Sequence, residues 1–304
     1  MRIFLTGGTG FIGSAVTSEL VNAGHQVLGL ARSDKGAASL AAVGADVHRG
    51  SLEDLDSLRS GAANSDGVIH TAFIHDFSKF KANCETDRHA IEALGSVLAD
   101  SDRPLIVTSG TGLLTPGRLA TEESAPPSNS TTIPRIASEE AALSVASQGA
   151  HVSVVRLPPS VHGDGDHGFV PLLISIAREK GVSAYVGDGL NRWPAVHQLD
   201  AAHLFRLALE RGSAGARYHG IADEGVAFRD IAGVIGRRLN LPVVSKSHDE
   251  AADHFGWFAP FAALDNPASS KLTQERLGWR PRQLALIPDL DRVRYFQTNA
   301  KLQI

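Results

Sequence analysis

The sequence contains a single cysteine, Cys84, which excludes an internal disulfide and suits a reducing compartment. Neither sign of charge is in excess. The 29 basic and 33 acidic residues leave a net charge of −4, which favours neither nucleic acid nor a membrane surface as partner. No apolar run approaches the roughly 20 residues of a membrane-spanning helix, and no basic leader precedes the first apolar run. We therefore expect a cytosolic protein whose partner is a small molecule.

The chain has 304 residues, enough for one large domain or two coupled ones. Over the first two-thirds, short apolar runs alternate with stretches of helical spacing. The expected strands are 3–6, 26–30, 46–49, 67–70, 105–108 and 152–156. The expected helices are 11–23, 35–42, 52–60, 78–99 and 134–148. This order predicts an α/β fold with a doubly wound parallel sheet of the Rossmann type, covered by helices on both faces.

Residues 6–13, Thr-Gly-Gly-Thr-Gly-Phe-Ile-Gly, join the first expected strand to the first expected helix. In this context Gly7 permits a tight turn, Gly10 lets the backbone approach a pyrophosphate, and Gly13 lets helix and strand pack closely. The N–H groups and the positive dipole end of the helix favour an anionic diphosphate. The run predicts a dinucleotide site formed by Gly7, Gly10, Phe11, Ile12 and Gly13.

Beyond Leu157 the pattern changes, because prolines and glycines at 158–168 mark a loop and the later elements are shorter. Helices are expected at 172–178, 201–210 and 229–238, and short strands at 185–186, 217–220 and 243–245. We therefore expect a dinucleotide-binding domain over 1–165 and a smaller substrate-binding region over 166–304. The second region is expected to be partly interleaved with the first.

Arg32 and Ser33 follow the second expected strand, where an NAD site carries an acidic residue for the ribose hydroxyl. A guanidinium and a hydroxyl at this point suit the 2′-phosphate of NADP. Asp34 argues for NAD, although it lies slightly late and is also placed to cap the following helix. Arg32 can equally be an ordinary surface cation. We expect NADP as the cofactor and NAD as the less favoured choice.

Further short motifs follow in order at 68–72, 107–111, 155–159 with 162–163, 197–200 and 277–281. With the glycine run they cover nearly the whole chain, and their order resembles the extended short-chain dehydrogenase/reductase family (NAD-dependent epimerase/dehydratase-like). That family includes sugar-nucleotide epimerases, dehydratases, and ketone and steroid-type dehydrogenases. The resemblance implies a homodimer paired through two long helices per subunit. It also implies that the cofactor is bordered by Thr71, Ala72, Leu157 and Pro158.

Typical members of that family carry a Tyr that transfers the substrate proton. A Lys four residues later lowers the pKa of the Tyr and holds the nicotinamide ribose. The corresponding helix here has Arg135 in place of the Tyr and Glu139 in place of the Lys, and no Tyr or Lys occurs between Lys81 and Lys180. The chain therefore resembles an atypical branch without the usual proton relay. Arg135 and Glu139 either form a surface ion pair or contact the ribose or substrate.

The candidate catalytic residues are Ser109, Thr111, His75 and Arg135. Ser109 and Thr111 lie just past the fifth expected strand, at the sheet edge where such folds bind ligands. The resemblance gives a hydroxyl there a hydrogen bond to the reacting oxygen, and the alternative is that both satisfy local backbone groups. His75 lies between aromatic residues after the fourth strand, and its ordinary pKa of about 6.5 suits proton transfer. A histidine in such a loop can equally be structural or solvated.

The loop after the sixth expected strand contains His162, Asp164, Asp166 and His167, which could in principle hold zinc. They lack cysteine support and helical spacing, so we expect no metal site. The resemblance instead places this loop, with His162, around the nicotinamide end and the substrate.

A turn at 187–194 is expected to enter the substrate region, where Arg192 and Trp193 are candidates to clamp an anionic or planar substrate. Trp193 can equally belong to the core. The resemblance gives His197 and Asp200 a structural role in tying the two regions together.

These observations lead to three hypotheses. The first is an NADP(H)-dependent oxidoreductase of a small carbonyl or alcohol, with water, Thr111 or His75 as a non-standard proton donor. The second is a non-catalytic NADP-binding regulator or redox sensor, which tolerates loss of the Tyr and Lys. The third is a sugar-nucleotide epimerase or dehydratase, which is least favoured because those reactions depend most on the Tyr base.

Overall fold

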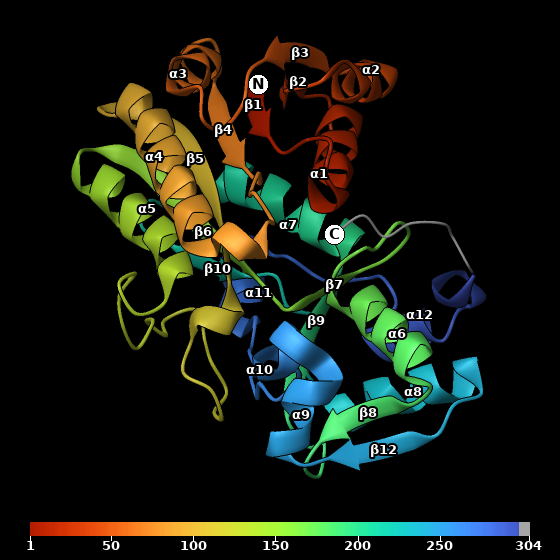
Figure 1. Ribbon diagram of the computed structural model, residues 1–304. Coiled ribbons are helices and arrows are strands. Elements are labelled where there is room, and N and C mark those ends of the chain that lie inside the picture. Colours follow the sequence, from red (N-terminus) through yellow and green to blue (C-terminus); the bar gives the residue numbers. More distant parts are fainter. Residues whose placement is uncertain (298–304) are drawn as a thin grey trace.

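The computed structural model describes residues 1–297 and is built around one seven-stranded sheet (Figure 1). Its strands run parallel in the order β10-β6-β5-β4-β1-β2-β3. Their bounds are β1 (Arg2–Thr6), β2 (Gln26–Ala31), β3 (Asp46–Arg49), β4 (Gly67–His70), β5 (Ser101–Gly110), β6 (Ala150–Leu157) and β10 (Arg217–His219). The chain runs outward from β1 to β3 and returns on the other side with β4. A switch point, where open α/β sheets bind ligands, therefore lies between β1 and β4.

Helices cover both faces of this sheet. Successive side chains of a strand point to opposite faces, and the apolar side chains of β1 are buried on both. Phe4 faces one layer, while Ile3 and Leu5 face the other. The first layer contains α3 (Leu55–Ala63), α4 (Phe80–Leu98) and α5 (Ala137–Ser147). The second contains α1 (Phe11–Asn22), α2 (Asp34–Ala42) and α7 (Gln198–Arg211). The predicted doubly wound parallel sheet is confirmed, and α7 and β10 join it from beyond residue 165.

The remaining elements form a smaller region next to the carboxyl ends of the strands (Figure 1). It contains a three-stranded sheet in the order β11-β9-β7 and a parallel pair, β8 and β12. The strands are β7 (Ser160–His162), β8 (Ser183–Val186), β9 (Arg192–His197), β11 (Asp223–Ala227) and β12 (Val243–Lys246). The helices are α6 (Phe169–Lys180), α8 (Phe228–Leu239), α9 (His248–Phe255), α10 (Ala259–Ala262), α11 (Lys271–Leu277) and α12 (Leu286–Leu290).

Several element boundaries differ from the sequence-based expectation. The helices expected from 78 and 134 begin with 3₁₀ turns, η1 (Phe77–Lys79) and η3 (Pro134–Ile136). The helix expected at 52–60 begins at Leu55, because Asp54 caps it by accepting the Ser57 N–H. The turn expected at 187–194 is shorter, because β9 begins at Arg192, which pairs with Ala227 of β11. Further 3₁₀ turns are η2 (Thr111–Leu113), η4 (Gly256–Phe258) and η5 (Val293–Phe296).

Asp200, near the start of α7, ties the two regions together. Its carboxylate accepts the N–H groups of Arg282 and Gln283, each at 2.9 Å. Its carbonyl oxygen accepts the indole N–H of the fully buried Trp279. The 197–200 and 277–281 motifs therefore meet in the structure. Across residues 1–297, no helix combines the length and the hydropathy that crossing a membrane requires.

Candidate functional site

The turn between β1 and α1 leaves an open stretch of backbone at the switch point. Gly7 has a φ of +74°, and a Cβ there would lie 2.6 Å from the Ala72 nitrogen. A Cβ on Gly13 would clash with the Gly7 carbonyl oxygen, so α1 packs directly on the turn. The N–H groups of Phe11 and Ile12, in the first turn of α1, have no intrahelical acceptor, and Gly10 supplies no side-chain cap for them. These features fit the diphosphate of a dinucleotide.

The other residues expected at the cofactor lie at neighbouring strand ends. The Thr71 hydroxyl donates to the Thr6 carbonyl oxygen at 2.7 Å, and the Ala72 nitrogen lies 3.4 Å from the Thr6 hydroxyl. Leu157 and Pro158 are buried at the end of β6. The structure thus places all four at the sheet edge that carries the glycine turn, and their contact with a cofactor stays a prediction.

The end of β2 corrects one expectation, because Ser33 and not Asp34 caps α2. The Ser33 hydroxyl accepts the Gly36 N–H at 3.2 Å. Asp34 is the first residue of α2 and pairs with Arg49 at 2.5 Å. Arg32 is exposed between β2 and α2. Asp34 and Arg32 are thus both exposed near the end of β2, Asp34 in a surface ion pair with Arg49 and Arg32 with its guanidinium toward solvent.

A buried chain of hydrogen bonds runs from the glycine turn to α4. The Thr6 hydroxyl lies 2.8 Å from His70 Nδ1, and His70 Nε2 lies 3.0 Å from the Asp87 carboxylate. All three residues are almost fully buried. Burial alone would raise the pKa of Asp87, but the charge of Arg135 and the hydrogen bond from His70 hold it below its usual value. Asp87 is therefore a buried carboxylate that stays ionised.

Arg135, in η3, is the group that Asp87 holds. Its guanidinium donates to Asp87 Oδ2 at 2.8 Å and to the Thr108 carbonyl oxygen at 3.2 Å. It also lies over the ring of Phe73, 4.3 Å from the ring centroid. The side chain keeps 17% of its surface exposed. A fixed, partly accessible cation thus stands beside the carboxyl end of β5, at the position that the family resemblance gives to the Tyr.

Glu139 has a different partner, so the interpretation of a surface ion pair with Arg135 is wrong. The Glu139 carboxylate accepts two hydrogen bonds of 2.7 Å from Arg156 in β6, and both side chains are buried. Burial would raise the pKa of Glu139, but the hydrogen bonds from Arg156 and Ser109 hold it below its usual value. Each of the two charges expected to meet at the surface is instead neutralised by a partner from another element.

The two candidate hydroxyls are already engaged. Ser109 donates to Glu139 at 2.7 Å. Thr111 is fully buried and donates to Asn266 Oδ1 at 2.9 Å, while the Asn266 amide donates back to the Thr111 carbonyl oxygen. These partners are side chains from α5 and from the segment before α11, and not the local backbone. The catalytic roles of Ser109 and Thr111 stay predictions.

His75 lies in the loop after β4, close to Arg135. Its ring contacts Phe73 edge-on, with centroids 5.2 Å apart, although the residue as a whole is exposed. Partial burial of the ring lowers the pKa of His75, and the nearby charge of Arg135 lowers it further. His75 is therefore largely neutral at pH 7 and stands next to a permanent cation.

The acidic and histidine side chains of the 162–167 loop, the candidate zinc ligands, each contact a different residue. His162 is fully buried and bonds Asp289 at 2.9 Å, and Asp164 pairs with Arg294. Burial raises the pKa of Asp166 to about 6. His167 lies against Phe11 at the start of α1, with ring centroids 5.7 Å apart. Within the described residues 1–297, no group of three or more His, Cys, Asp or Glu side chains is placed to hold a metal ion.

The predicted substrate residues are also partnered. Arg192 forms a two-point ion pair with Asp265, at 2.9 and 2.8 Å. Trp193 is fully buried, and its indole N–H donates to the Phe261 carbonyl oxygen, which favours the core interpretation. His162 likewise has no exposed surface. Contact of these residues with substrate stays a prediction.

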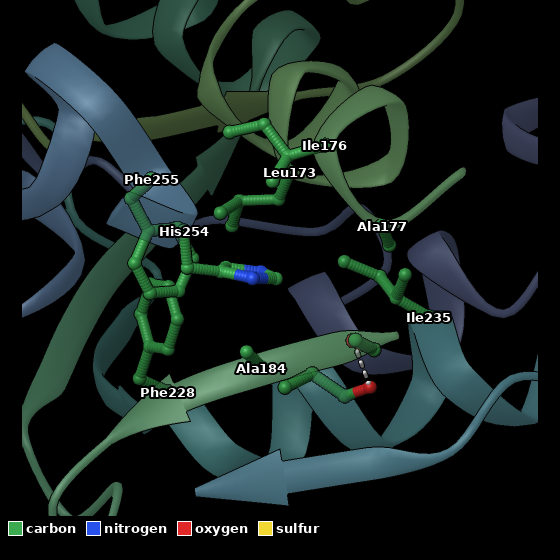
Figure 2. A pocket seen from close by; sticks show the side chains of 10 residues that line it. Leu173, Ile176, Ala177, Ala184, Phe228, Ile235, His254 and Phe255 are labelled. Atoms are coloured by element: carbon green, nitrogen blue, oxygen red, sulfur yellow. Dashed lines mark hydrogen bonds between the residues drawn. The ribbon is translucent and has the colours of Figure 1, made fainter. Parts of the chain in front are cut away.

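Figure 2 shows a cavity in the core of the second region, between α6, α8 and β8. Its volume is about 10 Å³, which is at the lower limit for one water molecule. Leu173, Phe228 and Ile235 line it, and burial lowers the pKa of His254, which also faces it. This cavity is too small to hold a substrate.

The residues that organise the site and that sequence reasoning missed are Asp87, His70, Arg156 and Asn266. Asp87 carries the clearest signal in the sequence. Asp87 lies three, four, seven and eleven residues before apolar positions of α4, so it falls on the buried stripe of that helix. A charge on such a stripe requires a buried partner. His70 and Arg156 carry a similar signal, because each falls in a strand expected to be covered by helices on both faces. No comparable pattern marks Asn266.

The buried Glu139–Arg156 pair predicts a measurable loss of stability. Glu139→Gln should lower the free energy of unfolding at pH 7 by about 3–5 kcal/mol, because it leaves the buried Arg156 charge without a counter-charge. Since the pKa of Glu139 is lowered on folding, its contribution is present above about pH 4.5 and is lost as pH falls further. Urea unfolding of both proteins between pH 3 and 7 checks this, with the exposed Glu275→Gln as control. A loss below about 1 kcal/mol contradicts it.

Comparison with known proteins agrees with this geometry. The model of the NAD dependent epimerase/dehydratase family matches residues 3–221. The Schizosaccharomyces pombe protein C2A9.02 is 54% identical over 297 residues, 97% of this chain and 100% of that protein. The 4-hydroxy-2-methyl-3-oxo-4-farnesyl-3,4-dihydroquinoline-1-oxide ketoreductase of Stigmatella aurantiaca is 30% identical over 228 residues, 72% of this chain and 67% of that protein.

Among solved structures, DesIV (dTDP-glucose 4,6-dehydratase) from Streptomyces venezuelae, with NAD and TYD bound, superposes with a TM-score of 0.78 over 98% of both chains at 22% identity. At that identity the likeness concerns the fold. The family and the glycine turn together support a nicotinamide dinucleotide as cofactor and the oxidoreductase and epimerase kind of activity. Because the family model matches well over half of its length, the chain belongs to the NAD dependent epimerase/dehydratase family, within the extended short-chain dehydrogenases/reductases.

Proposed function

We propose that this protein is an NADP(H)-dependent oxidoreductase of a small carbonyl or alcohol, in which Arg135 binds the substrate oxygen in place of a Tyr. The observation that carries the proposal is the fixation of the Arg135 guanidinium by Asp87 and the Thr108 carbonyl oxygen at the end of β5. Its remaining exposed surface is available to an oxygen that gains negative charge. The ketoreductase of Stigmatella aurantiaca supports the same class of reaction.

The cofactor part of the proposal depends on the backbone around Gly7 and Gly13, where a Cβ would occupy the turn. The N–H groups at the start of α1 would hold the diphosphate, and Thr71 and Ala72 would border the adjoining strand end. When bound, the dinucleotide supplies the hydride. Arg32, exposed at the end of β2, would bind the 2′-phosphate that distinguishes NADP from NAD.

Arg135 cannot serve as the proton donor itself, because a guanidinium does not lose its proton in proteins. It can stabilise the oxygen electrostatically, and a second group must supply the proton. His75 lies close enough to Arg135 for that charge to lower its pKa, and it is exposed. We assign proton donation during reduction to the protonated form of His75, which is the minor form at pH 7.

A second candidate function is a non-catalytic NADP-binding regulator. The observation that favours it is that Ser109 and Thr111 are both committed to internal hydrogen bonds. The two functions differ in one result: a regulator binds NADP tightly without turning over any carbonyl compound. A homodimer paired through α4 and α5, and a cytosolic location, are also proposed, on the family resemblance and the single buried cysteine.

Arg32 should set the choice between the two dinucleotides. Arg32→Ala is expected to weaken NADP binding by about 10- to 100-fold, since hydrogen bonds to charged groups contribute about 1.5–3 kcal/mol. NAD binding should change little, because NAD has no 2′-phosphate. Calorimetry with both dinucleotides measures this, with Arg59→Ala on the exposed face of α3 as control. Equal or tighter binding of NAD by the unsubstituted protein contradicts the assignment.

Arg135 should affect turnover more than cofactor binding. Arg135→Ala is expected to lower kcat/KM for NADPH-dependent reduction by about 100-fold or more, the usual cost of losing a donor to a developing oxyanion. Arg135→Lys keeps the charge but loses the planar fork, so an intermediate rate is expected. NADPH oxidation with a ketone and aldehyde panel gives the rates, and the Kd for NADPH reports whether the site remains folded. Unchanged kcat/KM in Arg135→Ala rules out the proposed role.

The proton donor should appear in the pH profile of reduction. Because the pKa of His75 lies below its usual value of 6.5, kcat/KM should fall as pH rises above that lowered pKa. His75→Gln should reduce the rate and remove this dependence. The same profile in both proteins would mean that another donor, water or Thr111, supplies the proton.

A further inference from the structure

A continuous row of aromatic rings joins the two regions next to Arg135. Phe73, under the Arg135 guanidinium, contacts Phe80 with ring centroids 6.2 Å apart. Phe80 stacks with Phe77 at 5.7 Å, and Phe77 stacks with Trp257 at 4.8 Å. The three phenylalanines lie in η1, at the start of α4 and in the loop before them, whereas Trp257 belongs to η4 of the second region. We call these four side chains the aromatic bridge.

Trp257 is the open end of the aromatic bridge. It is 48% exposed, whereas the other two tryptophans, Trp193 and Trp279, are fully buried. Its ring is held by edge contacts with Phe258, at 5.6 Å, and Phe261, at 6.2 Å. A fixed indole with exposed surface suits ligand stacking, because it offers a large apolar area and has little side-chain freedom left to lose.

Two arginines at the site already have carboxylate partners and are therefore less available to the diphosphate of a nucleotide sugar. Arg192, at the start of β9, has both ends of its guanidinium fork on Asp265. The charge of Arg135 is matched by the ionised Asp87 carboxylate. Arg192 and Arg135 are thus each paired with a carboxylate. The aromatic bridge beside Arg135 offers a flat, apolar surface.

We propose that the aromatic bridge binds the flat, apolar part of the substrate, so that the substrate is an aryl ketone or aryl aldehyde. The ring stacks on the exposed surface of Trp257, whose indole is itself stacked on Phe77, and the carbonyl oxygen points toward Arg135 at the Phe73 end. The carbonyl part of this inference rests on the proposed function, while the binding of a flat ring does not depend on turnover.

The test uses the full-length protein with 2-acetylnaphthalene as the flat probe, and butanone and UDP-glucose as contrasts. With 5-fluorotryptophan incorporated, the protein gives one ¹⁹F resonance for each tryptophan, and Trp257→Phe identifies that of Trp257. The flat probe should shift the Trp257 resonance and leave those of the buried Trp193 and Trp279 in place. Calorimetry supplies the Kd for each compound, with and without NADP.

Trp257→Ala and Phe77→Ala should each weaken binding of 2-acetylnaphthalene by about 3- to 10-fold, the range expected for losing one aromatic contact. Trp257→Phe keeps a flat ring and should stay within about twofold of the unsubstituted protein. Val43→Ala, an exposed apolar residue after α2, is the matched control. The inference is overturned if the Trp257 resonance does not move, if Trp257→Ala binds as tightly as the unsubstituted protein, or if UDP-glucose shifts the same resonance at lower concentration.

These outcomes separate the inference from the proposed function. Binding at Trp257 without any oxidation of NADPH supports the ring site and contradicts the reductase. Reduction of carbonyl compounds that is the same in Trp257→Ala and the unsubstituted protein supports the reductase and contradicts the ring site.

Discussion

The ionised carboxylate of Asp87, buried on α4, is the constraint on which the site depends. A buried charge requires partners, and Asp87 has three: His70, which links it to Thr6 beside the glycine turn, Arg135, and the hydroxyl of Ser138. One carboxylate thereby connects the strand that precedes the dinucleotide turn to the cation at the end of β5. The ion pair with Asp87 therefore holds the Arg135 side chain in one position, whereas an unpaired surface arginine would be mobile.

A second buried ion pair holds the start of α5, the helix that follows Arg135. Glu139 is bound by Arg156 of β6 and by the hydroxyl of Ser109 in β5. Arg135 and Glu139 therefore occupy the positions of the family's Tyr and Lys with opposite electrostatic roles. Arg135 keeps exposed surface and positive charge at the site, while Glu139 is neutralised inside the fold.

The fold was largely predictable because its signals are local. Glycines at fixed spacing and alternating apolar and helical stretches are sufficient to place β1 to β6 and the helices between them. The pairing of charges was not predictable in the same way. The i,i+4 spacing of Arg135 and Glu139 suggested a mutual ion pair, but each found a buried partner far away in sequence. Likewise, Phe77 and Trp257 are brought together only by the tertiary fold, and no sequence period marks that contact.

The central claim is that Arg135 faces the position of the substrate oxygen. A crystal structure of the complex with NADP⁺ tests it most directly. We expect the guanidinium of Arg135 beside nicotinamide C4, with room for a carbonyl whose oxygen lies about 2.7–3.2 Å from Arg135 and whose carbon lies about 3–3.5 Å from C4. A guanidinium turned away from C4, or a nicotinamide bound on another side of β5, would contradict the account.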